Sequence, residues 1–392
     1  MINGGGPLKR PIRLLFAISL YEINGACIVA KNLIEGLDRE RFEITLMAEQ
    51  VAERHLDLGS NIKVINLDLR PKKGLIKKIL NIRSHLRKIR KAALEQRPDI
   101  ILSFGTILNC YLLFALRLAG KRGVKIVISE HSEGFFTGYS RPYFKDRFLR
   151  RIYRLMMRFS YRKADCIIAV SQSIAENLKR LLKDSEKIKV IYNPVNINGI
   201  RKLLEEEDGV INGFEDLPRI VTVSRLSREK GMERLIMSFA GMVRRLDSRL
   251  IIVGDGRERL KLEALAETYN IGDKVRFMGW QDNPFKYLKR AGVFALPSIY
   301  EGFPNAVLEA MACGVPVVAS RSAGGIEELI DQGVDGILVN AADPAAFSNA
   351  LYELLSDQAS RNRIIAAASK KVERFDILKV AKEYEAVLDG LI

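Results

Sequence analysis

An alternation of strand-like and helical patterns runs through the whole sequence and constrains its fold more than any other feature. The strands are expected in thirteen apolar runs, at residues 12–18, 41–48, 62–67, 99–105, 125–130, 165–171, 187–192, 219–225, 248–256, 274–279, 292–298, 315–320 and 336–340. Near-continuous Val, Ile and Leu runs separated by helices are typical of parallel sheets that helices cover on both faces. We therefore predict an α/β protein built from doubly wound, Rossmann-like sheets.

The length of the chain, 392 residues, exceeds what one hydrophobic core usually supports, so we expect two domains. Residues 192–199, with Pro and Gly, and the acidic, irregular residues 203–218 mark a linker between them. We assign residues 1–195 to the first domain and residues 196–376 to the second, and we expect a last helix over residues 377–392 to pack back toward the first domain. Ligands of such paired sheets bind in the cleft at the carboxyl ends of the strands.

The cysteines and the N-terminus indicate the compartment. Four scattered cysteines without CxxC spacing, and only three histidines, favour a reducing cytoplasm with free thiols. Lys9, Arg10 and Arg13 precede an apolar run, as in a targeting segment, but the run is short and Tyr21 and Glu22 follow it. We interpret the run as a first buried strand.

Two loops that follow strands of the second domain carry candidate ligand-binding groups. Arg225 at a strand end and Lys230 in a turn before a helix could clamp a phosphate, although both could also be solvated turn charges. Gly254, Asp255 and Gly256 follow another buried strand, where glycines let a backbone approach a ligand or simply form a tight turn.

A third loop places two glutamates eight residues apart. Glu301 follows a strand, and a helix is expected to begin near Pro304 and Asn305, with free backbone N–H groups for an anion. If both glutamates were helical, Glu309 would lie about 80° from Glu301 around the axis, on one broad face. Carboxylates can accept hydrogen bonds from sugar hydroxyls; the alternative is an exposed glutamate on a surface helix.

Together these segments resemble the retaining family 4 glycosyltransferases, which have two Rossmann-like domains in the GT-B fold. The matching segments are "ADCIIAVS", "VIYNPVNI", "SRLSREKG", "VGDG", "EGFPNAVLEAMACGVPVVAS" with its Glu-x7-Glu spacing, and "AGGIEELI…VDGILV". The resemblance spans essentially the whole chain and is most specific over residues 220–340. It implies transfer of a sugar from a nucleotide-sugar with retention of configuration. An epimerase or phosphorylase of similar fold is the alternative, against which the intact Arg…Lys and Glu-x7-Glu pairs argue.

The resemblance also implies roles for individual residues. Arg225 and Lys230 would hold the donor diphosphate, Glu309 would bond the ribose hydroxyls, and Glu301 would grip the donor sugar as a positioning residue. His131 matches the active-site histidine of the family. The donor site would further include Asn24, Gly25, Gly254, Asp255, Arg276, Phe277 and Met278 near the base, and Gly302, Phe303, Pro304, Asn305 and Ala306. One departure is Asn24-Gly25, where the family usually has two glycines.

The chemistry that this family performs needs no resident metal or cofactor. Fixed cations can stabilise the charge that develops on the leaving diphosphate, and the sequence has no Asp-x-Asp pair to hold a divalent ion. We therefore expect no cofactor and no metal. The family precedent is a front-face displacement, and double displacement through a glycosyl-enzyme is the alternative. UDP is the favoured nucleotide and GDP the next, with a hexose or N-acetylhexosamine passed to a lipid-linked or growing saccharide in surface polysaccharide or glycan synthesis.

Basic residues are concentrated in the first half. Residues 1–200 hold 37 Lys and Arg against 18 Asp and Glu, a net charge of +19, whereas residues 201–392 have a net charge of −3. Residues 139–163 mix arginine with Tyr and Phe, and a basic helix is expected to pack on the sheet through an apolar stripe of Leu75, Ile79, Ile82, Leu86, Ile89 and Ala93.

This charge predicts an anionic partner for the first half. We expect a peripheral protein on the inner face of the cytoplasmic membrane, docked on anionic lipid. A nucleic-acid-binding module would use the same cations on phosphates, but no nucleic-acid motif accompanies them, so we expect no nucleic-acid partner.

Overall fold

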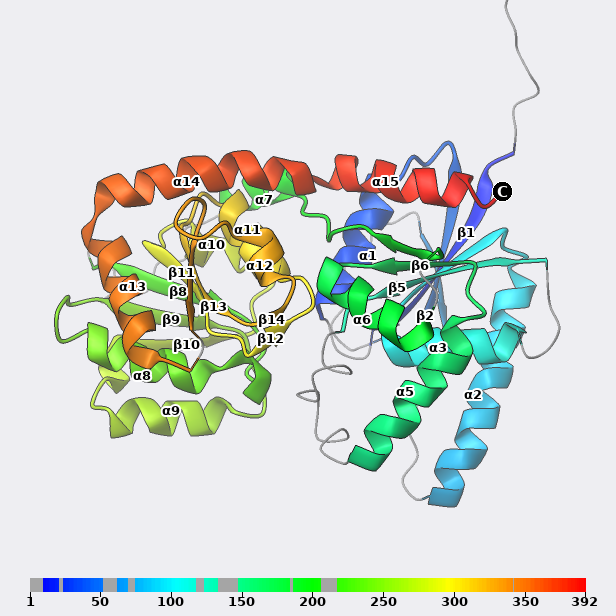
Figure 1. Ribbon diagram of the computed structural model, residues 1–392, viewed down its shortest axis with the longest axis horizontal. Helices are drawn as coiled ribbons and strands as arrows, with labels where there is room; N and C mark the ends of the chain where they lie inside the picture. The colour runs from blue at the N-terminus through cyan, green and yellow to red at the C-terminus, as the bar shows by residue number, and fades with distance from the viewer. Residues whose placement is uncertain are drawn as a thin grey trace, which may run out of the picture.

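The computed structural model describes residues 10–20, 24–51, 62–69, 75–117, 123–132, 147–183, 186–205, 217–340 and 342–392. They form two α/β halves, each built around a parallel sheet, which lie next to one another (Figure 1). Each of the thirteen predicted apolar runs contains a strand, so the prediction of two doubly wound sheets is confirmed.

The first sheet has seven parallel strands in the order β3-β2-β1-β4-β5-β6-β7. Its elements are β1 (Ile12–Leu20), α1 (Gly25–Gly36), β2 (Phe42–Val51), β3 (Lys63–Asn66), α2 (Leu75–Glu95), β4 (Ile100–Phe104), α3 (Thr106–Arg117), β5 (Lys125–Glu130), α5 (Arg147–Tyr161), β6 (Cys166–Ala169), α6 (Gln172–Leu182) and β7 (Ile188–Val190). The central strand β1 is the apolar run near the N-terminus, and Leu14 to Ile18 are buried in it. Its interpretation as a buried strand is right.

The second sheet has six parallel strands in the order β10-β9-β8-β11-β13-β15. Its elements are β8 (Arg219–Val223), η2 (Arg228–Lys230), α8 (Met232–Met242), β9 (Arg249–Val253), α9 (Arg259–Thr268), η3 (Gly272–Lys274), β10 (Val275–Gly279), α10 (Phe285–Leu288), β11 (Val293–Leu296), α11 (Asn305–Ala312), β13 (Val317–Arg321), α12 (Ile326–Leu329), β15 (Ile337–Asn340) and α13 (Pro344–Ser356). Two short strands that the sequence did not predict, β12 (Tyr300–Glu301) and β14 (Ala323–Gly324), pair beside this sheet.

The chain crosses twice between the halves. The first crossing leads into α7 (Ile197–Glu205). The prediction that residues 203–218 are irregular is therefore wrong at Leu203 to Glu205, which are helical. The second follows α14 (Gln358–Val372) and η4 (Glu373–Phe375) and leads into α15 (Ile377–Asp389), which returns to the first half (Figure 1). The crossings are bonded to each other, because Val195 N–H donates to Phe375 O (2.8 Å) and Ile377 N–H to Val195 O (3.0 Å).

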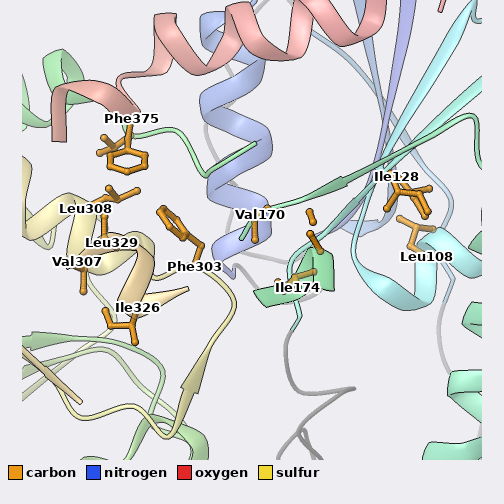
Figure 2. Packing of buried hydrophobic residues seen from close by; sticks show 14 of the residues in the cluster. Leu108, Ile128, Val170, Ile174, Phe303, Val307, Leu308, Ile326, Leu329 and Phe375 are labelled. Atoms are coloured by element: carbon orange, nitrogen blue, oxygen red, sulfur yellow. The ribbon is translucent and has the colours of Figure 1, made fainter. Parts of the chain in front are cut away.

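Apolar side chains at the junction join the two halves in one hydrophobic cluster. The ring of Phe303 lies 4.9 Å from that of Tyr192 and 5.6 Å from that of Phe375, measured between centroids. Figure 2 shows Phe303 between α11 and Phe375 on one side and Val170 and Ile174 of the first half on the other. Burial of these rings at the junction stabilises the contact between the halves.

The basic helices α2 and α5 both pack against α3 and extend beyond the sheet (Figure 1). In α2, Ile89 and Ala93 are buried as predicted, but Ile82 is 40% exposed. The prediction that the whole stripe packs on the sheet is therefore wrong at Ile82, because this part of α2 projects past the strands. Within the described ranges, no helix is long and apolar enough to cross a membrane.

Candidate active site

Loops from both halves meet at the start of α11, and they carry predicted residues from each half. Gly302 lies so close to His131 that a Cβ atom on it would be 2.1 Å from the His131 carbonyl oxygen. Asn305 Nδ2 donates a hydrogen bond of 3.0 Å to Gly25 O. The structure thus brings His131 and Gly25 of the first half to Gly302 and Asn305 of the second.

Glu301 is the centre of a polar cluster on the second half. Its Oε1 accepts hydrogen bonds from Lys230 Nζ (2.6 Å) and from Ser298 Oγ (2.7 Å), and its side chain is 12% exposed. Among the described residues, Oε2 has no partner. Glu301 lies in β12, before α11 begins, so the angle of 80° that would hold if both glutamates were helical does not apply. The cluster orients one carboxylate oxygen with a fixed cation and leaves the other for a ligand.

Lys230 is held in place by the turn that follows it. Gly231 has φ +65°, and a Cβ atom there would lie 2.1 Å from Pro297 O. Only glycine fits a left-handed position so close to another backbone, which explains the Lys-Gly pair. Nearby, the Arg225 guanidinium lies 3.6 Å from the Glu229 carboxylate of η2 and is 36% exposed. Both predicted phosphate cations therefore lie on the loop between β8 and α8.

Glu309 lies on α11, partly exposed, and no described residue bonds or pairs with its carboxyl group. Burial raises the pKa of Glu309 to about 7. Burial also raises the pKa of Cys313 to about 12, and the Glu309 charge adds to that shift. A carboxyl group that is desolvated without a partner costs stability. Such groups are enriched at functional sites, which agrees with a ligand-binding role.

The start of α11 is fixed by a residue that the sequence did not single out. The helix begins at Asn305, as predicted. Asn193, which is 3% exposed, donates from Nδ2 to Asn305 Oδ1 (2.7 Å) and to Phe303 O (3.1 Å). Pro304 and the Phe303 side chain are buried, whereas Ala306 is partly exposed. A ligand could therefore meet Phe303 only through its backbone.

The loop after β9 has a packing role. Gly254 has φ +128°, and a Cβ atom on it would lie 1.9 Å from Ser224 O. The backbone that approaches Gly254 therefore belongs to the loop after β8. This close approach explains the glycine at position 254 without a ligand. Asp255 is exposed and accepts from Gly256 N–H (2.7 Å).

The predicted base site lies inside β10. Arg276 is exposed, and its guanidinium lies near the carbonyls of Asp273 and Val275. Phe277 and Met278 pack in different hydrophobic clusters, because successive strand residues point to opposite faces. Their two side chains therefore lie on different sides of the sheet.

Asn24 explains the departure from a double glycine. Its side chain caps α1 by accepting hydrogen bonds from the N–H groups of Ala26 (3.0 Å) and Cys27 (3.3 Å). Asparagine is a favoured N-cap residue, so this position serves the helix while Gly25 meets Asn305.

His131 follows β5, next to a buried carboxylate. Glu130 is fully buried, and it accepts hydrogen bonds from Thr106 Oγ1, Tyr161 OH and the N–H groups of His131 and Ser132. Burial raises the pKa of Glu130 and lowers that of His131 to about 3. The imidazole is therefore neutral, and the Glu130 carboxyl fixes the loop that carries it.

Two further observations bear on ligands. Within the described part of the chain, no group of three or more His, Cys, Asp or Glu side chains could hold a metal ion; metal independence stays a prediction.

A cavity of about 250 Å³ lies at the junction. It is lined by Gln172, Val190, Tyr192, Arg374, Phe375, Val380 and Glu383, none of them a predicted site residue.

Two family models match the chain, one on each half. The model described as "Glycosyltransferase Family 4" matches residues 23–198. The model described as "Glycosyl transferases group 1" matches residues 205–371.

Two relatives come from Campylobacter jejuni. One, named GalNAc-alpha-(1->4)-GalNAc-alpha-(1->3)-diNAcBac-PP-undecaprenol alpha-1,4-N-acetyl-D-galactosaminyltransferase, is 25% identical over 377 residues, 95% of this chain and 97% of the relative. The other, N-acetylgalactosamine-N,N'-diacetylbacillosaminyl-diphospho-undecaprenol 4-alpha-N-acetylgalactosaminyltransferase, is 28% identical over 274 residues, 70% of this chain and 72% of the relative. A solved structure of Anabaena HepE in complex with UDP is similar in fold, with a TM-score of 0.75, 21% identity, and coverage of 97% of this chain and 100% of that one.

Proposed function

Since the chain belongs to the group 1 glycosyl transferases, we propose that it transfers a hexose or N-acetylhexosamine from a UDP-sugar, with retention of configuration and without a metal. The acceptor is a lipid-linked or growing saccharide in glycan synthesis. The relatives support this assignment, because both Campylobacter proteins are named as N-acetylgalactosaminyltransferases, with undecaprenol diphosphate in their names. The HepE structure supports UDP as the nucleotide.

The observation that carries the proposal is the Lys230–Glu301–Ser298 cluster opposite His131. In the reaction, the bond from the anomeric carbon to the diphosphate breaks, and a bond to the acceptor oxygen forms on the same face. The acceptor proton passes to the departing phosphate oxygen. Lys230 and Arg225 stabilise the charge on the leaving diphosphate, and Glu301 positions the sugar, so no side chain acts as a nucleophile.

Nucleotide release from a panel of UDP- and GDP-sugars, with EDTA present, tests the reaction. We expect release with a UDP-sugar, and its loss in the Arg225→Ala/Lys230→Ala variant. An Arg276→Ala variant of the exposed strand arginine should lose less activity, because no leaving-group charge develops there. Loss of wild-type activity in EDTA would refute metal independence, and near-normal rates for Glu301→Gln would refute the role of Glu301.

The same proposal places the first half on an anionic membrane, and α5 carries the surface that fits this partner. Ile152, Leu155 and Phe159 are 44%, 44% and 62% exposed and lie at helical spacing. Arg151 and Arg154 beside them are exposed too. An exposed apolar stripe flanked by arginines is typical of helices that lie in a membrane interface.

Helix α2, which packs on α3 as α5 does, carries further exposed cations. Arg83, Arg87 and Arg90 are exposed at helical spacing, next to the exposed Ile82. Each basic residue near an anionic surface contributes about 1 kcal/mol. The apolar stripe of α5 would insert into the membrane interface, and the arginines would give the preference for anionic lipid. Docking in this way would bring a lipid-linked acceptor close to the active site.

Flotation with vesicles of phosphatidylglycerol and phosphatidylcholine tests this surface. We expect binding to mixed vesicles, little binding to phosphatidylcholine alone, and a severalfold loss for Leu155→Asp. The matched control is Leu260→Asp, since Leu260 is 80% exposed on the second half. Equal binding by both variants, or binding to duplex DNA alone at the same salt concentration, would contradict the membrane proposal.

A further inference from the structure

We propose that the C-terminal helix α15 sets the tautomer of the active-site histidine, through a hydrogen-bond chain from Tyr384 OH to Ser129 Oγ to His131 Nε2. The chain leaves Nδ1 as the protonated ring nitrogen, so His131 presents a neutral N–H donor. The role of that donor rests on the proposed function, whereas the tautomer itself does not.

The chain of atoms joins the end of the sequence to the active site. Ser129 Oγ lies 2.9 Å from His131 Nε2 and 3.4 Å from Tyr384 OH. Ser129 and Tyr384 are both fully buried. The His131 ring also lies 5.7 Å from the ring of Phe104, measured between centroids. The imidazole thus lies close to both an aromatic ring and a hydroxyl.

Counting hydrogens decides the direction of the chain. If Tyr384 donates to Ser129 and Ser129 donates to Nε2, both hydroxyl hydrogens are used. If Nε2–H donated to Ser129 and Ser129 to Tyr384, the buried Tyr384 hydrogen would have no partner among the described residues. If Nε2–H and Tyr384 both donated to Ser129, the buried Ser129 hydrogen would have none. A buried donor without a partner is disfavoured, so the first direction holds.

The carboxylate next to the histidine does not compete for the ring. Both oxygens of Glu130 are engaged by the hydroxyls of Thr106 and Tyr161 and by backbone N–H groups. The depressed pKa of His131 agrees with a neutral imidazole. With Nε2 accepting from Ser129, the single ring proton lies on Nδ1.

The consequence is that His131 acts as a hydrogen-bond donor and not as a base. His131 is partly exposed and its backbone lies against Gly302, next to Glu301. A neutral N–H there can donate to an oxygen of the bound donor sugar or its phosphate, while no proton is transferred. Tyr384 and Ser129 are positioning residues, since they reach the reaction only through His131.

Nitrogen-15 NMR on protein labelled in histidine tests the tautomer directly, because the chain has only three histidines. A His131→Gln variant assigns the signals. We expect Nδ1 of His131 to carry the proton in the wild type. In Tyr384→Phe and in Ser129→Ala, we expect a shift toward the Nε2–H form, which is the commoner form of free histidine.

The matched control is Tyr287→Phe, since Tyr287 is also buried but lies in the second half; it should leave the tautomer unchanged. Melting curves verify that each variant is folded. A wild-type His131 with its proton on Nε2, or an unchanged tautomer in both Tyr384→Phe and Ser129→Ala, would overturn the proposal.

Sugar transfer provides the second measurement. We expect kcat of Tyr384→Phe to fall about three- to tenfold with KM little changed, as for one weakened hydrogen bond. A shifted tautomer with unchanged kcat would overturn the donor role of His131. If no nucleotide-sugar is a substrate, the proposed function fails, but the NMR result still decides the tautomer.

Discussion

Replacing Glu309 by glutamine is expected to stabilise the ligand-free protein, and to do so only above about pH 5. Burial without a partner raises the pKa of Glu309 from 4.5 to about 7. Below pH 4.5 the carboxyl is protonated in both the folded and the unfolded chain, so it adds no pH-dependent cost. Between pH 4.5 and 7 the unfolded chain loses the proton first, and the free energy of unfolding falls as pH rises.

The size of the effect follows from the shift. One pKa unit corresponds to about 1.4 kcal/mol, so the full penalty at pH 8 is about 3 kcal/mol at most. Because the side chain is partly exposed, water screens part of it, and we expect about 1 to 3 kcal/mol. For a domain of this size, that corresponds to a rise in Tm of roughly 3 to 10 °C.

Thermal unfolding of wild type and Glu309→Gln at pH 5 and pH 8 measures this difference. The control is Glu353→Gln, since Glu353 is exposed on α13, and it should shift Tm little at either pH. The reasoning would be refuted if Glu309→Gln shifted Tm equally at both pH values. It would also be refuted if the Tm of the variant at pH 8 were lower than that of the wild type.

The same substitution should weaken UDP binding under the proposed function. If the ribose hydroxyls donate to the carboxylate, UDP binds the ionised form better, and wild-type affinity should rise as pH increases through 7. Calorimetric titration of Glu309→Gln should show weaker binding without this rise. Identical pH dependence in the two proteins would exclude contact between Glu309 and the ribose.

Three further substitutions test single contacts. Ser298→Ala removes one donor to Glu301 and should lower kcat/KM about three- to tenfold with Tm nearly unchanged; full activity would show that Lys230 alone orients the carboxylate. Asn193→Ala leaves two acceptors unpaired and should reduce the free energy of unfolding by about 1 to 3 kcal/mol in urea titrations. Gly254→Ala should reduce the free energy of unfolding by about 3 kcal/mol or more, because of the positive φ of Gly254 and the nearby Ser224 oxygen. Gly123→Ala should be tolerated, since a Cβ atom there meets no atom within 4 Å. Equal stability of the two variants would contradict this packing argument.

The sheets could be predicted from the sequence because a buried parallel strand leaves a local signal. Most runs of Val, Ile and Leu sit between helical patterns, so they can be recognised as strands without knowing which distant residues they contact. Strands β12 and β14 were missed because each has two residues, too few to form a pattern. The exposure of Ile82 was missed because helical periodicity shows which residues share a face, but not how far the sheet extends beneath that face.

The candidate site was predictable where its residues lie together in the sequence, as from Glu301 to Glu309. The residues that hold the site in place could not be predicted, because they come from distant segments of the chain. Asn193 reaches Asn305 across the junction, and Tyr384 reaches Ser129 over 255 positions. A single Asn or Tyr in an ordinary setting carries no pattern of its own, and only the folded chain gives it a partner.

The position of α15 also bears on the order in which the protein folds during synthesis. Val380, Ala381, Tyr384 and Leu388 complete the hydrophobic cluster that covers one face of the first sheet. The first half emerges first from the ribosome, but that cluster lacks these four members until Leu388 has been made. All strands of the second sheet lie before α15 in the chain, so they can pair before α15 is made. A chain truncated after residue 376 would therefore have all the strands of the second sheet but would leave one apolar face of the first half uncovered, and chaperones and proteases recognise such faces.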